Sequence, residues 1–205
     1  MAVVVAATAT ALALLILPTA PLSPATLPQA SADPCPEIEV VFGRGQGEAP
    51  GLGAIGDAFV KAIQMKSGRP IASYAINYPA ANLDIAPGVA DMSSHIETTA
   101  ANCPNTRFIL GGYSLGAAVT FRVLNNGLSP GIDQRVIGVA TFGNASRALK
   151  LPATVPPPYA SKTLDQCNPG DPACSGQPFW PAHLAAFYIM GGPVNKAADA
   201  AVSLL

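Results

Sequence analysis

Apolar runs alternate along the chain with segments of helical periodicity. Short runs of Val, Ile and Phe bounded by Gly, Pro or polar residues are typical of buried strands, and apolar residues spaced by three or four positions are typical of helices. The predicted strands cover residues 38–42, 71–76, 107–110, 136–142 and 161–164. The predicted helices cover residues 54–65, 87–101, 117–124, 183–190 and 194–205. Because strands and helices alternate, we predict a three-layer α/β domain with a central parallel sheet of about five strands.

The stretch of residues 151–159, between the fourth and fifth predicted strands, contains four prolines. Proline lacks the backbone N–H of a helical hydrogen bond, and its ring clashes with the preceding turn. We therefore predict no helix in this stretch. The sequence has no internal repeat and no linker long enough to divide residues 33–205, which are predicted to form one domain.

Residues 1–32 are predicted to be a secretory signal peptide. Residues 2–17 are apolar apart from two threonines, and Ala30 and Ala32 stand at the small-residue positions of an A-x-A cleavage site. The basic start of a typical signal peptide is missing, since no Lys or Arg precedes Arg44. A transmembrane anchor is the alternative, but the apolar run is short for a membrane span. The predicted location is therefore secreted, outside the cell or in the cell envelope.

The charge of the chain excludes one class of partner, and its cysteines suggest cross-links. Charged residues make up only 11% of the 205 residues, and the formal net charge is −1. No run of basic residues is present, so we expect no nucleic-acid partner. All four cysteines follow the proposed cleavage site, and an even number of cysteines in an exported chain indicates two disulfides.

The spacing of the cysteines alone allows three pairings. Cys167 and Cys174 bracket a short segment that must turn tightly, so a bridge between these two is the simplest interpretation, and it leaves Cys35 with Cys103. A metal site is the alternative. It is disfavoured because the chain has no C-x-x-C pair and no histidine close in sequence to these cysteines.

The segment Gly112–Gly116 has the pattern G-x-S-x-G and lies between the predicted strand 107–110 and the predicted helix 117–124. A strand, a sharp turn and a helix are the setting of a nucleophile elbow, in which glycines leave room for the turn. We therefore predict that Ser114 is a nucleophile. The alternative is a serine that only supports a turn.

A serine hydroxyl needs a general base, and the base needs an orienting carboxylate. On an α/β sheet of this kind the order along the chain is serine, acid, histidine. The chain has two histidines, and His183 is the one that follows Ser114, so His183 is the predicted base. His95 lies in the predicted helix 87–101, before the elbow, and is predicted to be a surface or boundary residue.

Three acidic residues lie between Ser114 and His183, namely Asp133, Asp165 and Asp171. Asp133 precedes a predicted strand, which is the wrong end of a parallel sheet for an active site. Asp165 and Asp171 both follow the fifth predicted strand. Asp171 is favoured because the proposed short disulfide would hold its carboxylate in place, although N-P-G-D-P is also strong turn sequence. Asp165 remains open at this point.

The transition state formed by a serine nucleophile also needs donors for a developing oxyanion. The backbone N–H of Leu115, directly after the nucleophile, is one predicted donor. The second is predicted in the glycine-rich loop 43–48 after the first strand, with the N–H of Gln46 as the best candidate. This loop lacks the Lys-Ser/Thr ending of a phosphate-binding P-loop, so nucleotide binding is disfavoured.

Three motifs of this chain resemble the cutinases, in particular the cutinase-like esterases exported by mycobacteria and related actinobacteria. The motifs are the elbow Gly112–Gly116, the Gly43-Arg44-Gly45 loop and, above all, the box C-N-P-G-D-P-A-C at 167–174 followed by His183. The resemblance covers the chain from Cys35 onward. It implies an α/β-hydrolase-type fold, the pairs Cys35–Cys103 and Cys167–Cys174, and no cofactor or metal.

The resemblance also implies the chemistry of the site. It assigns the catalytic acid to Asp171 and implies hydrolysis of carboxylic esters of short to medium acyl chain through an acyl-enzyme. Two positions depart from the family, which usually has Gln at Leu115 and often Ser or Thr at Gln46, so a side-chain donor to the oxyanion is expected to be missing.

Three other functions fit the same motifs. An acyltransferase would use the same triad with an alcohol as acceptor, an acetylxylan-type esterase would act on a polysaccharide, and a non-catalytic exported binding protein would only retain the fold. For the favoured esterase, the expected partners are an ester or lipid substrate and peripheral contact with lipid or the cell envelope. The expected oligomeric state is a monomer.

Overall fold

Five parallel strands form the central sheet of the computed structural model, in the order β2-β1-β3-β4-β5. The strands are β1 (Ile38–Gly43), β2 (Ala72–Ala75), β3 (Arg107–Tyr113), β4 (Val136–Phe142) and β5 (Thr163–Gln166). The three central strands are almost entirely buried, which explains why they read as continuous apolar runs. The predicted fold class is confirmed.

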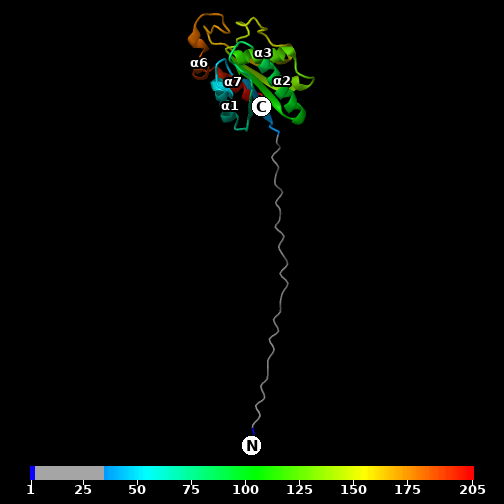
Figure 1. Cartoon of the computed structure of the whole chain (residues 1–205). Coiled ribbons are helices and arrows are strands. Elements are labelled where there is room, and N and C mark those ends of the chain that lie inside the picture. The colour runs from blue at the N-terminus through cyan, green and yellow to red at the C-terminus, as the bar shows by residue number, and fades with distance from the viewer. Residues whose placement is uncertain (3–34) are drawn as a thin grey trace. The chain divides into compact units, whose positions relative to one another are not determined.

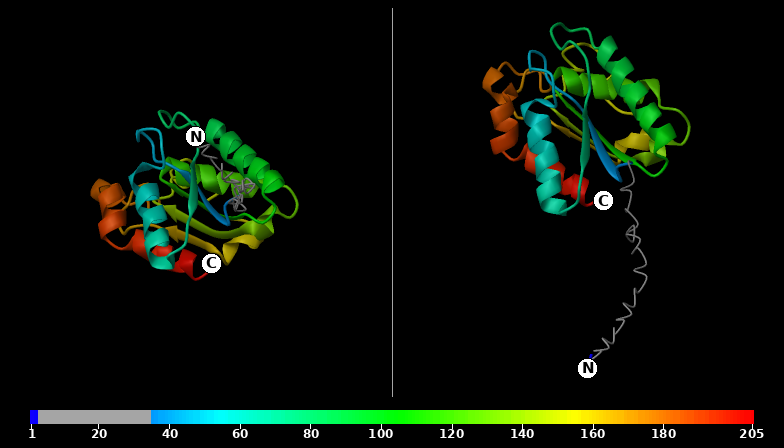
Figure 2. Two further views of the ribbon diagram at one scale, coloured as in Figure 1. Left: turned by 90° about the horizontal axis from the view of Figure 1, so that it is seen from below. Right: turned by 60° about the horizontal axis from the view of Figure 1, so that its bottom comes forward.

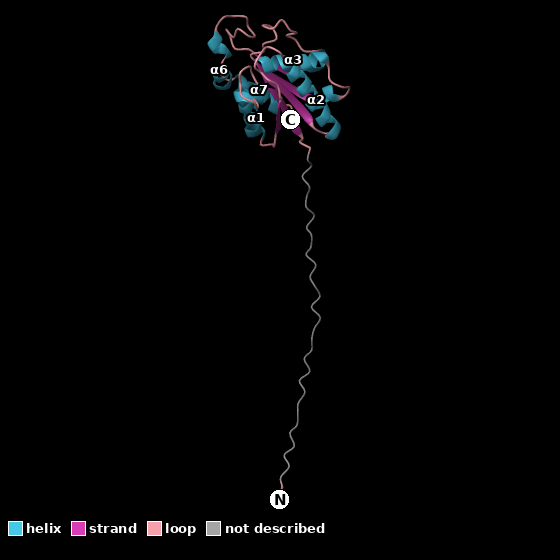
Figure 3. Ribbon diagram, in the orientation of Figure 1, coloured by secondary structure: helices cyan, strands magenta, loops and turns pink. Residues whose placement is uncertain are grey.

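Helices cover both faces of this sheet and make the three layers (Figures 1 and 2). The helices α1 (Gly53–Ser67) and α7 (Pro193–Val202) pack against each other on one face, and α6 (Ala185–Met190) lies beside them. The helices α2 (Ala86–Asn102) and α3 (Leu115–Asn126) cover the other face. Figure 3 shows the long loops that join strands to helices at the end of the sheet where the site described below is built.

Successive residues of β1 show how the two cores form. Val40 and Phe42 belong to the core under α1 and α7, whereas Val41 belongs to the core under α2 and α3. Neighbouring side chains of a strand point to opposite faces, so a strand between two helical layers is apolar at most positions; Glu39 is the exception in β1. Each large side chain buried in this way contributes roughly 1.5–3 kcal/mol.

The structure describes residues 1–2 and 35–205, so the predicted signal peptide lies outside the described residues apart from Met1 and Ala2. No helix in the described part has the length and apolar character to cross a membrane. The first disulfide, Cys35–Cys103, joins the start of residues 35–205 to the end of α2, with the Cα atoms 5.4 Å apart.

Several predicted boundaries were wrong, and the proline-rich stretch shows why. A one-turn helix, α5 (Pro157–Ala160), lies where no helix was predicted. Its prolines occupy the first helical positions, where the missing N–H has no helical acceptor in any case. The predicted strand 161–164 is β5, two residues further along. The predicted helix 183–190 is divided into the 3₁₀ helix η1 (Trp180–His183) and α6.

One short helix was not predicted at all. The helix α4 (Ile132–Arg135) forms a single turn immediately before β4. A single turn carries too few residues to display helical periodicity in the sequence.

Candidate active site

Ser114 lies in the sharp turn between β3 and α3. Its backbone has φ +53° and ψ −112°, a conformation that L-residues rarely adopt. A side chain at Gly112 would collide with the backbone of Gly116, and a side chain at Gly116 would collide with the carbonyl of Gly43 on β1. The Ser114 N–H donates to the carbonyl of Phe142 at the end of β4, at 2.9 Å. The turn therefore depends on close contact between regular elements.

His183 lies within hydrogen-bond distance of both Ser114 and Asp171. The Nε2–Oγ distance to Ser114 is 2.9 Å across 69 residues of sequence, and Nδ1 lies 2.9 Å and 2.8 Å from the two carboxylate oxygens of Asp171. With the Nδ1–H tautomer, the imidazole donates to the carboxylate and accepts the serine O–H. This is the arrangement that general-base activation of a serine requires.

Asp171 is fully buried, yet its surroundings favour the charged form. Burial raises the pKa of Asp171, but hydrogen bonds from His183, Tyr188 and the N–H of Ala173 outweigh burial, and the pKa lies below its ordinary value. The Tyr188 hydroxyl donates to Oδ2 at 2.6 Å, and the Ala173 N–H donates to Oδ1 at 2.8 Å. A carboxylate held in this way is ionised at neutral pH.

The loop that carries Asp171 is closed by the second disulfide, Cys167–Cys174, with the Cα atoms 5.9 Å apart. Inside the loop, the Asp171 N–H donates to the carbonyl of Asn168 at 3.1 Å. The side-chain amide of Asn168 donates to the carbonyl of Ala182 at 2.9 Å. The cysteine loop is thus tied directly to the turn that carries His183.

The other acidic candidates lie elsewhere. Asp165 accepts hydrogen bonds from Thr141 at 2.7 Å and from Asn144 at 3.5 Å. Asp133 lies in α4, before β4, at the opposite end of the sheet. Of the three acids, Asp171 is the one that contacts His183.

The remaining histidine lies outside this site. His95 lies on α2, where its ring stacks on Tyr74 with the centroids 3.5 Å apart. Its Nε2 lies 3.1 Å from the carboxylate of Glu39 on β1. His95 therefore packs against β2 and β1, at the boundary between α2 and the sheet, in agreement with a role in the fold.

The two predicted oxyanion donors lie at the N-terminus of α3 and in the loop after β1. Leu115 is the first residue of α3, so its N–H has no intrahelical acceptor and lies at the positive end of the helix dipole. Gln46 is exposed at the tip of a turn in which the Glu48 N–H donates to the carbonyl of Gly45, at 3.3 Å.

Arg44 and Glu48 hold this loop, although neither was predicted to have a role in the site. Arg44 is only 3% exposed, and its guanidinium donates to the carbonyls of Tyr78 at 2.6 Å and Glu48 at 2.9 Å. The Glu48 carboxylate accepts the N–H groups of Gly45 at 2.6 Å and Ala54 at 2.9 Å. Both residues stand in the glycine-rich loop after the first strand, and Arg44 also belongs to the Gly43-Arg44-Gly45 motif.

Large apolar side chains are exposed in the segment 179–190, which flanks His183 in the sequence. We call this set the apolar rim; its members are between 48% and 81% exposed and are Phe179, Trp180, Leu184, Phe187 and Met190. The ring centroid of Trp180 lies 6.0 Å from that of His183. Monomeric proteins rarely expose a group of this kind without a function in binding. None of these residues was predicted to belong to the site.

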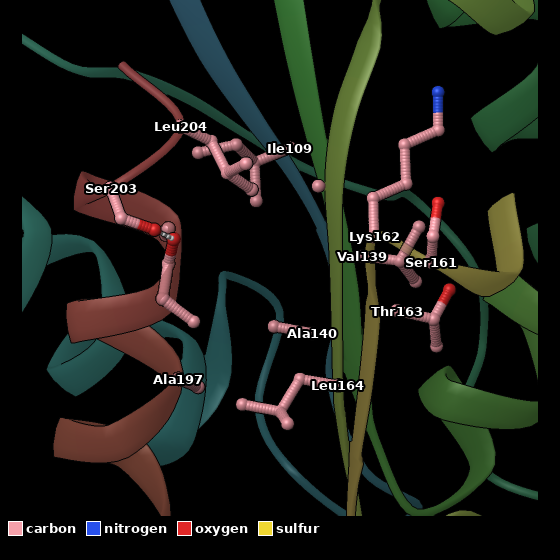
Figure 4. Close-up of a pocket in the computed structure, with 13 residues that line it drawn as sticks. Ile109, Val139, Ala140, Ser161, Lys162, Thr163, Leu164, Ala197, Ser203 and Leu204 are labelled. Atoms are coloured by element: carbon pink, nitrogen blue, oxygen red, sulfur yellow. Dashed lines mark hydrogen bonds between the residues drawn. The ribbon is translucent and has the colours of Figure 1, made fainter.

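Two further features lie apart from this constellation. A mainly apolar cavity of about 220 Å³ lies between α7 and the strands β4 and β5 (Figure 4), and none of the residues that line it belongs to the site. Among the residues that the structure describes, no three His, Cys, Asp or Glu side chains gather in the manner of metal ligands.

Comparison with known proteins identifies the family. The Cutinase family model matches residues 34–205. The chain is 42% identical over 212 residues to the probable carboxylesterase Culp2 of Mycobacterium tuberculosis, across 94% of this chain and 91% of that protein. It is 43% identical over 189 residues to the phospholipase Culp4 of the same species, across 86% of this chain and 82% of that protein.

A solved structure has the same fold over most of its length. A cutinase-like protein from Cryptococcus sp. superposes with a TM-score of 0.69 at 26% identity, across 85% of this chain and 97% of that chain. The family model and the curated relatives span nearly the whole of residues 35–205. The chain therefore belongs to the cutinase family.

Proposed function

We propose that this member of the cutinase family, a carboxylic ester hydrolase, is an exported serine esterase that acts through an acyl-enzyme. Ser114 is the nucleophile, His183 the base and Asp171 the orienting acid. The observation that carries the proposal is the unbroken chain of hydrogen bonds from the buried, ionised carboxylate through the imidazole to the hydroxyl of a strained turn.

The reaction begins when Ser114 Oγ attacks the ester carbonyl carbon and its proton passes to His183 Nε2. Asp171 stabilises the imidazolium that forms. The tetrahedral intermediate then expels the alcohol, whose oxygen takes the proton from His183, and the acyl group remains on Ser114. In the second half, water attacks the acyl carbon while His183 takes its proton. The acyl–Oγ bond then breaks, His183 returns the proton to Ser114 Oγ, and the carboxylic acid leaves.

The oxyanion is stabilised by the backbone N–H groups of Leu115 and Gln46. Donors of this kind act because they are fixed before the reaction begins, so no reorganisation is needed as charge develops. Arg44 and Glu48 support this role because their hydrogen bonds constrain the loop that carries Gln46. Leu115 has no side-chain donor, so at this position the oxyanion hole depends on the backbone N–H.

The substrate is an ester with a short to medium acyl chain on a lipid-like body. The apolar rim supports this choice because it offers an acyl chain an exposed hydrophobic contact beside His183. A relative named as a phospholipase agrees with a lipid ester. Export is supported by the two disulfides, which persist in oxidising compartments. A monomer in peripheral contact with lipid is the expected form.

Hydrolysis of p-nitrophenyl butyrate tests the proposal. Ser114→Ala is expected to lower kcat by at least about 10⁴-fold, because only the oxyanion hole and binding remain. Ser203→Ala, which changes an exposed serine at the end of the chain, is the matched control and should retain wild-type activity. Wild-type activity in Ser114→Ala would refute the assignment of the nucleophile.

A further inference from the structure

Tyr188 places a buried hydroxyl in contact with the proposed catalytic acid. It lies on α6, five residues after His183, and its side chain is fully buried. Its hydroxyl donates to Asp171 Oδ2 at 2.6 Å, and its oxygen accepts the N–H of Asn168 at 3.2 Å. The phenol therefore links the helix after the histidine to the cysteine loop and to the carboxylate at once.

The two oxygens of Asp171 are held in matching ways. Oδ1 accepts the N–H of Ala173 at 2.8 Å, and Oδ2 accepts the Tyr188 hydroxyl at 2.6 Å. The Nδ1 atom of His183 lies between the two oxygens, 2.9 Å from one and 2.8 Å from the other. Without the phenol, Oδ2 would have no fixed donor of its own, and the carboxylate could rotate about the bond to its β-carbon.

The ring of Tyr188 cannot easily move away from this position. It packs edge-on against Phe142 with the ring centroids 6.1 Å apart, and its centroid lies 6.1 Å from that of Tyr113. Burial and the hydrogen bond to Asp171 both raise the pKa of Tyr188, so the phenol keeps its proton and remains a donor across the working pH range.

We propose that Tyr188 is a positioning residue for ester hydrolysis, which acts through Asp171. Its O–H fixes the plane of the carboxylate so that the Nδ1–H of His183 lies between both oxygens. It also withdraws charge from the carboxylate and so limits how strongly Asp171 stabilises the imidazolium. This proposal rests on the proposed function, since it gives Tyr188 a task only if Asp171 and His183 activate Ser114.

The two roles predict different consequences for the variant Tyr188→Phe. Loss of a donor to a charged acceptor is expected to lower kcat roughly tenfold while KM stays within about twofold. Without the Tyr188 hydroxyl, the Asp171 carboxylate keeps more of its negative charge and interacts more strongly with the imidazolium formed in the reaction. The acid limb of the pH profile of kcat is therefore expected to move to higher pH.

The experiment measures kcat, KM and the pH profile of the mature chain with p-nitrophenyl butyrate. Tyr159→Phe is the matched control, because Tyr159 is also buried, at 3% exposed, but lies in the core under α2 and α3. This control should retain the wild-type rate and profile. In a second variant, 3-fluorotyrosine replaces Tyr188. Its phenol is slightly larger and more acidic but still donates a hydrogen bond, so this variant should fold normally. The acid limb of its kcat profile is expected to move to lower pH.

An unchanged pH profile in both Tyr188 variants would overturn the proposal, even if kcat fell, because a purely structural role predicts lower stability without a shift. Opposite shifts in the two variants would support it. Failure of the underlying function is recognised separately: it would appear as an active Ser114→Ala variant, whereas an inactive Ser114→Ala with an unaffected Tyr188→Phe refutes only the role of Tyr188.

Discussion

The nucleophile and the acid–base pair are held by different kinds of structure. Ser114 lies between a buried strand and a buried helix, and close packing of Gly112, Gly116 and Gly43 defines its turn. Asp171 and His183 lie in the segment 167–184, which contains no strand and only one 3₁₀ turn.

The two halves of the site should therefore respond differently to mutation. The acid–base half is held by a disulfide, by the Asn168 amide and by the Tyr188 hydroxyl. Of these three, only the Tyr188 hydroxyl comes from a regular element, the helix α6. Single changes in segment 167–184 should thus separate activity from stability, which changes in the elbow glycines cannot do because they disturb the sheet itself.

The largest expected effect is that of Asp171→Asn. An amide cannot replace the ionised acceptor and can leave His183 in the wrong tautomer, so kcat should fall by about 10⁴-fold while the melting temperature changes little. The matched variant is Asp165→Asn, which alters hydrogen bonds to Thr141 and Asn144 but does not touch His183. It should retain most of its activity. A low kcat in Asp165→Asn together with a wild-type kcat in Asp171→Asn would reverse the assignment of the acid.

The two disulfides offer the next test, because each belongs to a different part of the fold. Replacement of Cys167 and Cys174 by serine should lower kcat by about 10- to 100-fold, because Asp171 loses the constraint on its loop. The loss of unfolding free energy should be modest, about 2.5 kcal/mol for a loop closed across 7 residues. A wild-type kcat in this variant would show that the bridge does not position the acid.

Replacement of Cys35 and Cys103 by serine should give the opposite result. This bridge spans 68 residues, so its removal should cost about 4 kcal/mol of unfolding free energy. Its cysteines lie at the start of residues 35–205 and at the end of α2, so kcat of the folded enzyme should stay unchanged. Denaturant unfolding and kcat, measured on both double variants, compare the bridges directly.

The smallest expected effect comes from Glu48→Gln in the oxyanion loop. The amide can accept only one of the two N–H groups that the carboxylate accepts, so kcat should fall roughly tenfold with little change in KM. The ratio of ester to thionoester hydrolysis should also fall, since sulfur is a poor acceptor in an oxyanion hole. Glu97→Gln, on α2 beside Ser129, is the control. An unchanged ratio would remove Glu48 from this role.

The difference between the two halves also explains what the sequence could predict. The elbow is a local pattern, because strand, turn and helix follow one another, and the periodicity of residues 38–142 predicted four of the five strands closely. Asp171 was favoured over Asp165 because of the flanking cysteines, and the family resemblance then made the choice. Both arguments rest on short-range sequence features.

The contacts that support the site were not predictable in the same way. Tyr188 reaches Asp171 across 17 residues, and Arg44 reaches the carbonyl of Tyr78 across 34 residues. Such contacts depend on how loops meet at the end of the sheet, and an aromatic residue in an apolar helix looks like any other core residue in the sequence. The apolar rim was missed for the same reason, since burial cannot be read from composition alone.

Covalent labelling of the serine tests the central claim most directly. A fluorophosphonate reacts quickly only with a serine that an adjacent base activates. Mass spectrometry of the labelled wild-type protein should find one adduct, on Ser114, and His183→Ala should react at least about 100-fold more slowly. Labelling of another serine, or equal rates in the wild type and His183→Ala, would contradict the proposed activation of Ser114 by His183.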